Sequence, residues 1–142
     1  MAVMTALPKR RVKPITGEEL LALGDIGPSE LIDGRIVTMT PTGSEHGLIE
    51  SNLTTELRFF LRQRRLGWVA GGEVGIYTRR NPDRVRAADI AFISTSRLAQ
   101  PVKGYLTVAP DLVVEIMSPD DRWQDLREKL AEYFAIGVTW VW

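Results

Sequence analysis

The chain has 142 residues, of which 44% are hydrophobic and 25% charged, a composition typical of one ordinary globular domain and too short for two. It contains no cysteine, which excludes disulfides and thiolate zinc sites and fits a reducing compartment, so we expect a cytoplasmic protein. Its formal net charge is zero, so a polyanionic partner would have to be bound by local basic patches rather than attracted by the whole molecule.

Residues 1–15 are predicted to form a flexible lead-in and residues 16–142 a single domain. The lead-in is basic through Lys9, Arg10, Arg11 and Lys13. No apolar segment follows these residues, so neither a signal peptide nor a membrane anchor is expected. A solvated tail explains the basic run more simply than a phosphate-contacting arm does. Thr16 and Glu19 have the spacing of a capping box, which predicts a short helix over residues 17–23.

The segment 30–39, ELIDGRIVTM, is predicted to form a hairpin. Asp33-Gly34 between two alternating segments is a strong signal for a two-residue turn. Glu30 opens the first arm, and from the segment alone a charge on an edge strand is its simpler interpretation.

Apolar residues recur at helical spacing from Ser44, a candidate N-cap, to about Arg65, which predicts an amphipathic helix. His46 is the only histidine and lies near the buried face of its first turn. A histidine there is more often packed or capping than catalytic. The far end of the helix is basic through Arg58, Arg62, Arg64 and Arg65.

Residues 68–77 are predicted to form a strand weakened by glycine, and residues 78–86 a turn before the next strand. The turn carries four arginines, Arg79, Arg80, Arg84 and Arg86. A solvated hairpin tip and a nucleic-acid-binding loop that holds phosphates explain them equally well.

Two apolar runs, 87–93 and 112–117, are predicted to be buried strands, and each contains one acid. Asp89 lies within AADIAFI and Glu115 within LVVEIM. A buried carboxylate is costly unless it is ion-paired, hydrogen-bonded or bound to a metal. These two acids are therefore the first functional candidates in the chain.

Ser118-Pro119 predicts the start of a helix that runs to about residue 136, with Asp120 and Asp121 capping it rather than binding a metal. Its predicted buried stripe is Trp123, Leu126, Leu130 and Phe134. Lys129 flanks this stripe, where its stem could simply cover the edge of the core. Gly137 ends the helix, and a further strand begins at residue 138, so we expect that the domain is C-terminally truncated.

Asp89 and Glu115 on neighbouring strands cannot both stay ionised unless a cation neutralises them. Oxygen donors suit Mg²⁺ or Mn²⁺ rather than Zn²⁺. Such an ion polarises a phosphoryl group and activates water, and Lys129 could stabilise the charge that develops. Ion pairing with basic side chains is the simpler alternative for the two acids.

The order ELIDGRI, His46, AADIAFI, APDLVVEIMSPDDR and DLREKLAEYFAIGVTWVW resembles the Uma-two family of restriction endonucleases, within the PD-(D/E)XK nuclease superfamily. The resemblance implies an α/β fold, a restriction-endonuclease-like mixed central sheet flanked by helices. It also implies Asp89 and Glu115 as metal-binding catalytic acids and Lys129, on the next helix, as the family's lysine. Glu30 and His46 match further site positions.

Three departures from the pattern matter. Ala88 stands where the superfamily has proline, and Met117 stands where a strand lysine would follow Glu115, so the lysine assignment depends on Lys129. The family also usually continues past the terminal tryptophan.

The resulting hypothesis is a magnesium- or manganese-dependent endonuclease that cuts DNA, with no membrane partner and with homodimer formation expected by analogy. The main alternative is an inactive nuclease-fold module that binds nucleic acid or protein. A hydrolase of small phosphoesters is a second alternative.

Overall fold

The computed structural model describes residues 12–142, so Lys9, Arg10 and Arg11 of the predicted lead-in lie outside the described residues. Its elements are α1 (Gly17–Ala22), β1 (Ser29–Ile32), β2 (Arg35–Thr38), α2 (Ser44–Leu61), β3 (Gly67–Arg79), β4 (Arg84–Ser94), β5 (Leu112–Val114), α3 (Trp123–Ile136) and β6 (Trp140–Val141). The strands form one six-stranded sheet in the order β2-β1-β4-β5-β6, with β3 paired to β4. All pairs are antiparallel except β5–β6, which confirms the predicted mixed sheet flanked by helices.

Short-range sequence signals account for helix α1 and the β1–β2 hairpin. The capping box forms as predicted, because the Thr16 side chain accepts a bond from Glu19 N (3.1 Å) and Glu19 Oε2 accepts one from Thr16 N (2.7 Å). Asp33 and Gly34 both have positive φ, 52° and 73°, as a hairpin turn that matches the strand twist requires. The predicted hairpin is therefore confirmed.

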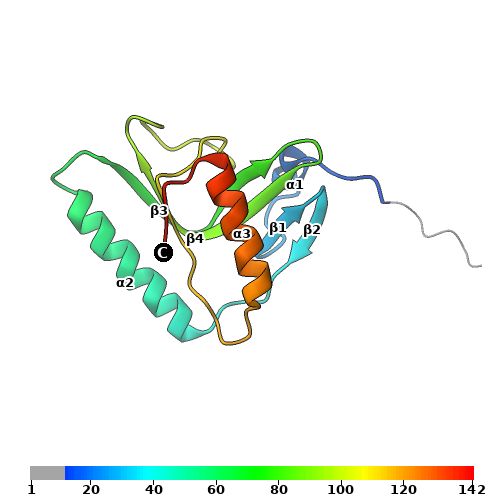
Figure 1. The fold of residues 1–142 in the computed structure, drawn as a ribbon, viewed down its shortest axis with the longest axis horizontal. Helices are drawn as coiled ribbons and strands as arrows, with labels where there is room; N and C mark the ends of the chain where they lie inside the picture. Colours follow the sequence, from blue (N-terminus) through cyan, green and yellow to red (C-terminus); the bar gives the residue numbers. More distant parts are fainter. Residues whose placement is uncertain (1–11) are drawn as a thin grey trace, which may run out of the picture.

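Strand β4 is the centre of the sheet, buried along nearly its whole length. In β5, Val113 joins the hydrophobic cluster that contains Tyr133 of α3, whereas Leu112 and Val114 join the cluster packed against α2. Because alternate residues of a strand point to opposite faces, α2 and α3 cover opposite faces of the sheet. The starts of both helices lie at the same end of the molecule, where the segment after β5 leads into α3 (Figure 1).

The boundaries of α2 and β4 differ from the prediction. Gly43 rather than Ser44 is the N-cap of α2, and the helix ends at Leu61 rather than near residue 65. Strand β4 begins at Arg84, so the predicted turn over 78–86 is wrong in extent, since the strand pairs β3 and β4 continue as far as Arg79 and Arg84.

The prediction for α3 is wrong at its start and in its phase. Ser118 and Asp121 close a turn of their own, with Ser118 N donating to Asp121 Oδ2 (2.6 Å), and the helix begins only at Trp123. Trp123 and Phe134 are exposed, whereas Tyr133 is fully buried. Compared with the predicted stripe, the inward face of the helix is shifted by about one residue. Lys129 and Tyr133 can lie on this face because both hydrogen-bond to Glu115 beneath the helix.

No helix within residues 12–142 has the length and apolar character that a bilayer crossing requires.

Candidate active site

A cleft of about 990 Å³ opens beside β4 and the segment that follows β5. Its walls come from the loop before α2, the first turns of α2, residues 115–121 and one side chain of α3. The structure brings four of the predicted catalytic residues into this cleft, His46, Asp89, Glu115 and Lys129. The fifth, Glu30, lines a smaller adjoining cavity that shares Glu115 and Lys129 with the cleft.

His46 and Asp89 line the cleft, and Glu50 lies beside them. His46 and Glu50 are one helical turn apart on α2, which places both side chains on the face of the helix that meets β4. His46 Nε2 lies 3.3 Å from Asp89 Oδ1, and His46 Nδ1 lies 4.0 Å from Glu50 Oε2. One ligand atom from each residue falls within 4.8 Å of the other two.

Each of these two carboxylates is anchored by one oxygen and presents the other to the histidine. Glu50 Oε1 accepts a bond from Gly72 N (2.6 Å), and Asp89 Oδ2 accepts one from Ile116 N (2.6 Å). His46 is only 8% exposed, and its Nδ1 has no hydrogen-bond partner among the described residues. A buried imidazole nitrogen without a partner is costly, so this cluster has room for a further polar group.

The residue types suit a divalent cation. In an octahedral site with bonds of about 2.0–2.1 Å, neighbouring ligands lie roughly 3 Å apart, which fits the 3.3 Å between His46 Nε2 and Asp89 Oδ1; Glu50 faces the other ring nitrogen, Nδ1, at 4.0 Å. Two carboxylate oxygens with one imidazole nitrogen suit Mg²⁺ or Mn²⁺, the imidazole favouring the softer ion. This differs from the predicted pair, because Glu50 and His46 rather than Glu115 gather with Asp89.

Glu73 adds a carboxylate that the sequence did not suggest. It lies in an irregular part of β3 between Gly71 and Val74, has a positive φ of 62° and lines the cleft. Burial and the charge of Asp89 raise its pKa above the ordinary value. A non-glycine residue in this backbone region is uncommon, although Asp33, Arg65 and Asn81 adopt it outside the cleft.

Lys129 forms the opposite wall. Its Nζ donates to Ala87 O (2.7 Å) and Glu115 Oε2 (2.9 Å) and lies 3.1 Å from Glu30 Oε1. Burial lowers the pKa of Lys129, but the charges of Glu115 and Glu30 outweigh it and raise the pKa above its ordinary value. Lys129 is therefore a fixed positive charge at the cleft rather than a base.

Glu115 lies just past the end of β5, one step beyond the Ile90–Val114 pair and so opposite Asp89. Both of its oxygens have partners, since Tyr133 donates to Oε1 (2.7 Å) and Lys129 to Oε2. Burial raises the pKa of Glu115 to about 7, against the opposing effects of Lys129 and Tyr133. Its proton occupancy would therefore change near neutral pH in the metal-free protein.

The four arginines predicted to bind nucleic acid all pair with carboxylates of this chain. Arg79 and Arg84 bind Asp33, and Arg80 binds Glu18. Arg86 is 10% exposed at its side chain and donates to Glu30 (3.0 Å) and, through two nitrogens, to Glu132 (2.6 and 2.9 Å). None of the four lines the cleft, and Arg86 alone borders the adjoining cavity. Their contact with nucleic acid stays a prediction, and this placement gives it no support.

A mixed sheet between helices, with carboxylates and a charged lysine gathered beside two central strands, is the architecture of a nuclease-like α/β domain. A solved structure supports this class: the chain is similar to "a putative nuclease belonging to DUF820" from Anabaena variabilis, with a TM-score of 0.73 and 25% identity over 91% of this chain and 73% of that one. The family model Uma2, described as "Putative restriction endonuclease", matches residues 18–142, so the chain belongs to this family. A search of curated proteins finds no match.

Three site residues were missed from the sequence. Glu50 could have been found, because it follows His46 by one helical turn. Tyr133 carried no signal beyond its place beside Lys129 on the same helix. Nothing in the sequence pointed to Glu73, whose position depends on an irregularity in the pairing of β3.

Proposed function

We propose that this protein is an endonuclease that hydrolyses phosphodiester bonds of DNA with Mg²⁺ or Mn²⁺. The observation that carries the proposal is the cluster of His46, Glu50 and Asp89, with the unpartnered Nδ1 of His46, at the cleft that His46, Asp89 and Lys129 line. The family description and the nuclease neighbour support a nuclease. DNA as the substrate, a cytoplasmic location and homodimer formation belong to the proposal through the family resemblance.

Asp89 and Glu50 would hold the ion through one carboxylate oxygen each, with one ring nitrogen of His46 as the third ligand. When bound, the ion would polarise the phosphoryl oxygen and lower the pKa of a water molecule. Glu115 accepts one hydrogen bond at each oxygen, from Tyr133 and from Lys129, so each oxygen keeps a lone pair with which it could also bind the ion. We therefore propose Asp89 as the central ligand and Glu115 as a further ligand that keeps its contact with Lys129.

Lys129 would stabilise negative charge as the phosphate is attacked. Its ammonium is held by three acceptors from three parts of the chain, so little reorganisation would be needed at the moment of reaction. Glu30 would act on Lys129 by positioning it, because Glu30 faces the lysine and Arg86 rather than the cleft. Glu73, on the side of Asp89, would be a second acid within reach of the ion or its water.

The test combines metal binding with cleavage. Supercoiled plasmid is incubated with purified protein and Mg²⁺ or Mn²⁺, using Asp89→Asn and, as a matched control, Glu56→Gln, an exposed acid of α2 outside the cleft. We expect nicking by the wild type and the control, and a loss of more than about 100-fold in Asp89→Asn, the effect of losing transition-state stabilisation. Mn²⁺ at about 100 times its Kd should stabilise the wild type against unfolding by about 2.7 kcal/mol, and Asp89→Asn much less.

Cleavage that persists in Asp89→Asn would contradict the metal assignment. DNA binding without cleavage in either metal would favour the inactive nuclease-fold module, for which Met117 in place of a strand lysine is the observation in its favour.

A further inference from the structure

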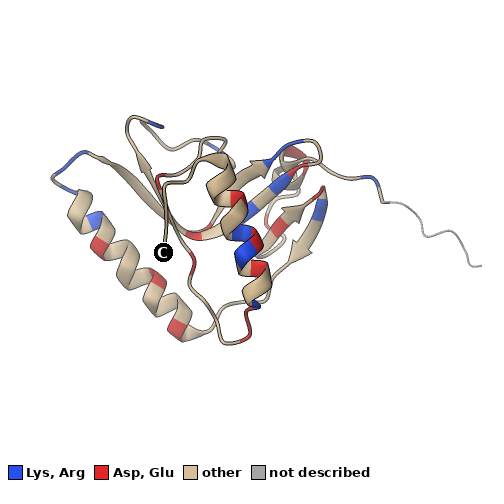
Figure 2. Ribbon diagram, viewed as in Figure 1, with Lys and Arg blue, Asp and Glu red and all other residues tan. Residues whose placement is uncertain are grey.

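A second group of arginines lies at the other end of α2 and in the loop after it. This α2 arginine group consists of Arg58, Arg62, Arg64 and Arg65, all exposed. Within residues 12–142 no carboxylate lies within ion-pair distance of any of them, in contrast to Arg79, Arg80, Arg84 and Arg86. Figure 2 shows basic residues at the far end of α2 and in the following loop, with one acidic band of the helix next to them and the other acidic bands closer to its start.

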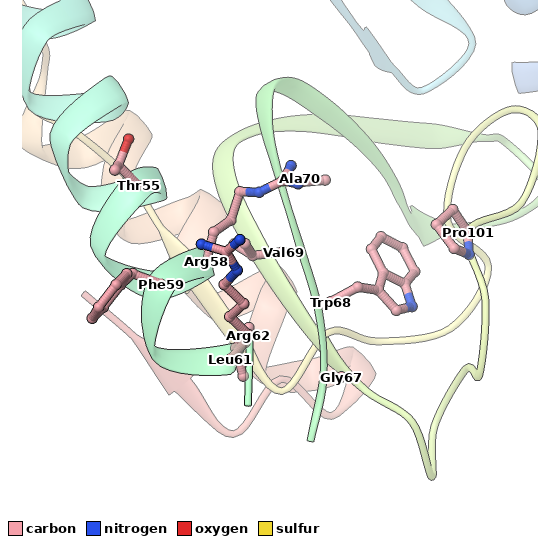
Figure 3. A pocket seen from close by; sticks show the side chains of 10 residues that line it. All are labelled: Thr55, Arg58, Phe59, Leu61, Arg62, Gly67, Trp68, Val69, Ala70 and Pro101. Carbon is pink, nitrogen blue, oxygen red and sulfur yellow. The ribbon is translucent and has the colours of Figure 1, made fainter. Parts of the chain in front are cut away.

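A groove of about 860 Å³ adjoins this group between α2 and the first residues of β3. The side chains of Arg58 and Arg62, one helical turn apart, extend from α2 toward Val69 and Ala70 (Figure 3). Trp68 lies on the other side of this part of β3. The groove therefore has apolar walls and two guanidinium groups whose charge no described carboxylate compensates.

We propose that this groove binds the backbone of the DNA substrate at a distance from the cleft, with Arg58 and Arg62 contacting phosphates; the inference rests on the proposed function. Arginine forks match phosphate oxygens, and phosphate contacts supply most of the affinity for DNA. Along α2 at 1.5 Å per residue, Arg58 and Arg62 lie about 18 and about 24 Å from His46. At about 3.4 Å per nucleotide of one strand, this is a flank of roughly five to seven nucleotides.

The charge argues against a second copy of this chain as the occupant. A two-fold contact uses the same patch on both copies and would bring two α2 arginine groups face to face. An acidic peptide also has the right charge, and competition with polyglutamate separates it from DNA.

The experiment measures binding of fluorescent DNA duplexes by anisotropy in EDTA, so that no cleavage occurs, over a series of salt concentrations. The variant is the double substitution Arg58→Gln/Arg62→Gln. Lys103→Gln/Arg127→Gln is the control, because it removes the same charge from exposed residues that form no ion pair within residues 12–142. Arg58→Lys/Arg62→Lys keeps the positive charge but removes the guanidinium groups, which can donate two parallel hydrogen bonds to one phosphate.

With a 20-base-pair duplex, Arg58→Gln/Arg62→Gln should weaken binding at least about tenfold, because two charged hydrogen bonds are lost. The slope of log K against log salt should fall by about 2, one per phosphate contact. The lysine variant should keep part of the affinity, and the control should match the wild type.

An unchanged affinity for the 20-base-pair duplex would overturn the inference, and so would an equal loss in the Lys103/Arg127 control. Competition by polyglutamate at the same charge concentration as DNA would also overturn it, because the groove would then be a general polyanion site. If the protein cuts DNA in the plasmid assay while the arginine variant binds normally, only this inference fails. If the wild type binds no DNA, the proposed function fails with it.

Discussion

The two arginine groups of this protein have similar density in the sequence but opposite environments in the fold. The group at the β3–β4 end, Arg79, Arg80, Arg84 and Arg86, is paired with carboxylates throughout. The α2 arginine group has no such partner within the described chain. The carboxylates that hydrogen-bond to the first group lie 44 to 62 residues away in sequence. Availability for a ligand therefore depends on what the fold packs against each guanidinium, and not on how many arginines a segment contains.

The first group also extends toward the active site as a continuous network. Glu132 of α3 accepts bonds from Arg84 and Arg86, and Arg86 binds Glu30, which lies beside Lys129. Arg86, the arginine next to the site, is largely buried, whereas Arg79, far from it, is about half exposed. We therefore expect the inner arginines to matter for stability and for the position of Lys129, and the α2 arginine group to matter for binding.

Replacing Arg86 should give the largest effect on stability. Arg86→Met leaves Glu30 and Glu132 without their buried partner, so the free energy of unfolding should fall by about 3–5 kcal/mol. Urea unfolding followed by circular dichroism measures this. Arg79→Gln is the comparison, because its pair is about half exposed and should contribute less than about 1 kcal/mol. Equal losses in free energy of unfolding in the two variants would contradict the expectation that the buried ion pairs of Arg86 contribute more than the exposed pair of Arg79.

The next largest effect on stability is expected at acid pH, where protonation of Glu132 should weaken its ion pairs with Arg84 and Arg86. Burial raises the pKa of Glu132, but hydrogen bonds from Arg86, Thr78 and Arg84 and the charge of Arg86 outweigh it, so the pKa lies below the ordinary value of 4.5. The folded state then binds this proton less readily than the unfolded state does. Its contribution is present above about pH 4.5 and is lost as the pH falls through the lower, folded pKa.

We expect Glu132→Gln to lower the free energy of unfolding at pH 7 by roughly 1.5–3 kcal/mol, the effect of losing charged hydrogen bonds. The difference from the wild type should shrink below pH 4.5, where the wild-type carboxyl also becomes neutral. Urea unfolding at a series of pH values from 3 to 7 measures it. A constant difference across this range would mean that Glu132 acts through packing rather than through charge.

The smallest effect on stability is expected in the α2 arginine group. Arg58→Gln/Arg62→Gln should change the free energy of unfolding by no more than about 0.5 kcal/mol, because both side chains are exposed and neither has an ion-pair partner within residues 12–142. Thermal unfolding of the same preparations used for DNA binding checks this. A loss as large as that of Arg86→Met would remove the distinction between the two groups.

Much of the fold could be predicted from short stretches of sequence. The capping box at Thr16, the Asp33-Gly34 turn and the buried strand around Asp89 depend on neighbouring residues and were confirmed. The run 112–117 was confirmed only in part, because the strand ends at Val114 and Glu115 lies beyond it. The boundaries of α2 and the phase of α3 were wrong. Tertiary packing decided them, since polar partners beneath α3 allowed Lys129 and Tyr133 to face inward.

The sequence by itself determined an acid within one buried apolar run, a second acid at the end of another and the lysine on the following helix, because an apolar run makes a buried charge visible without a structure. Only the tertiary structure decided which groups those charges meet. It placed Glu50 and His46 beside Asp89, gave Glu115 to Lys129 and Tyr133, and enclosed one arginine group among carboxylates while leaving the other open. The physical reason is that electrostatic interactions act over a few ångströms in space, and sheet register and helix placement set those distances.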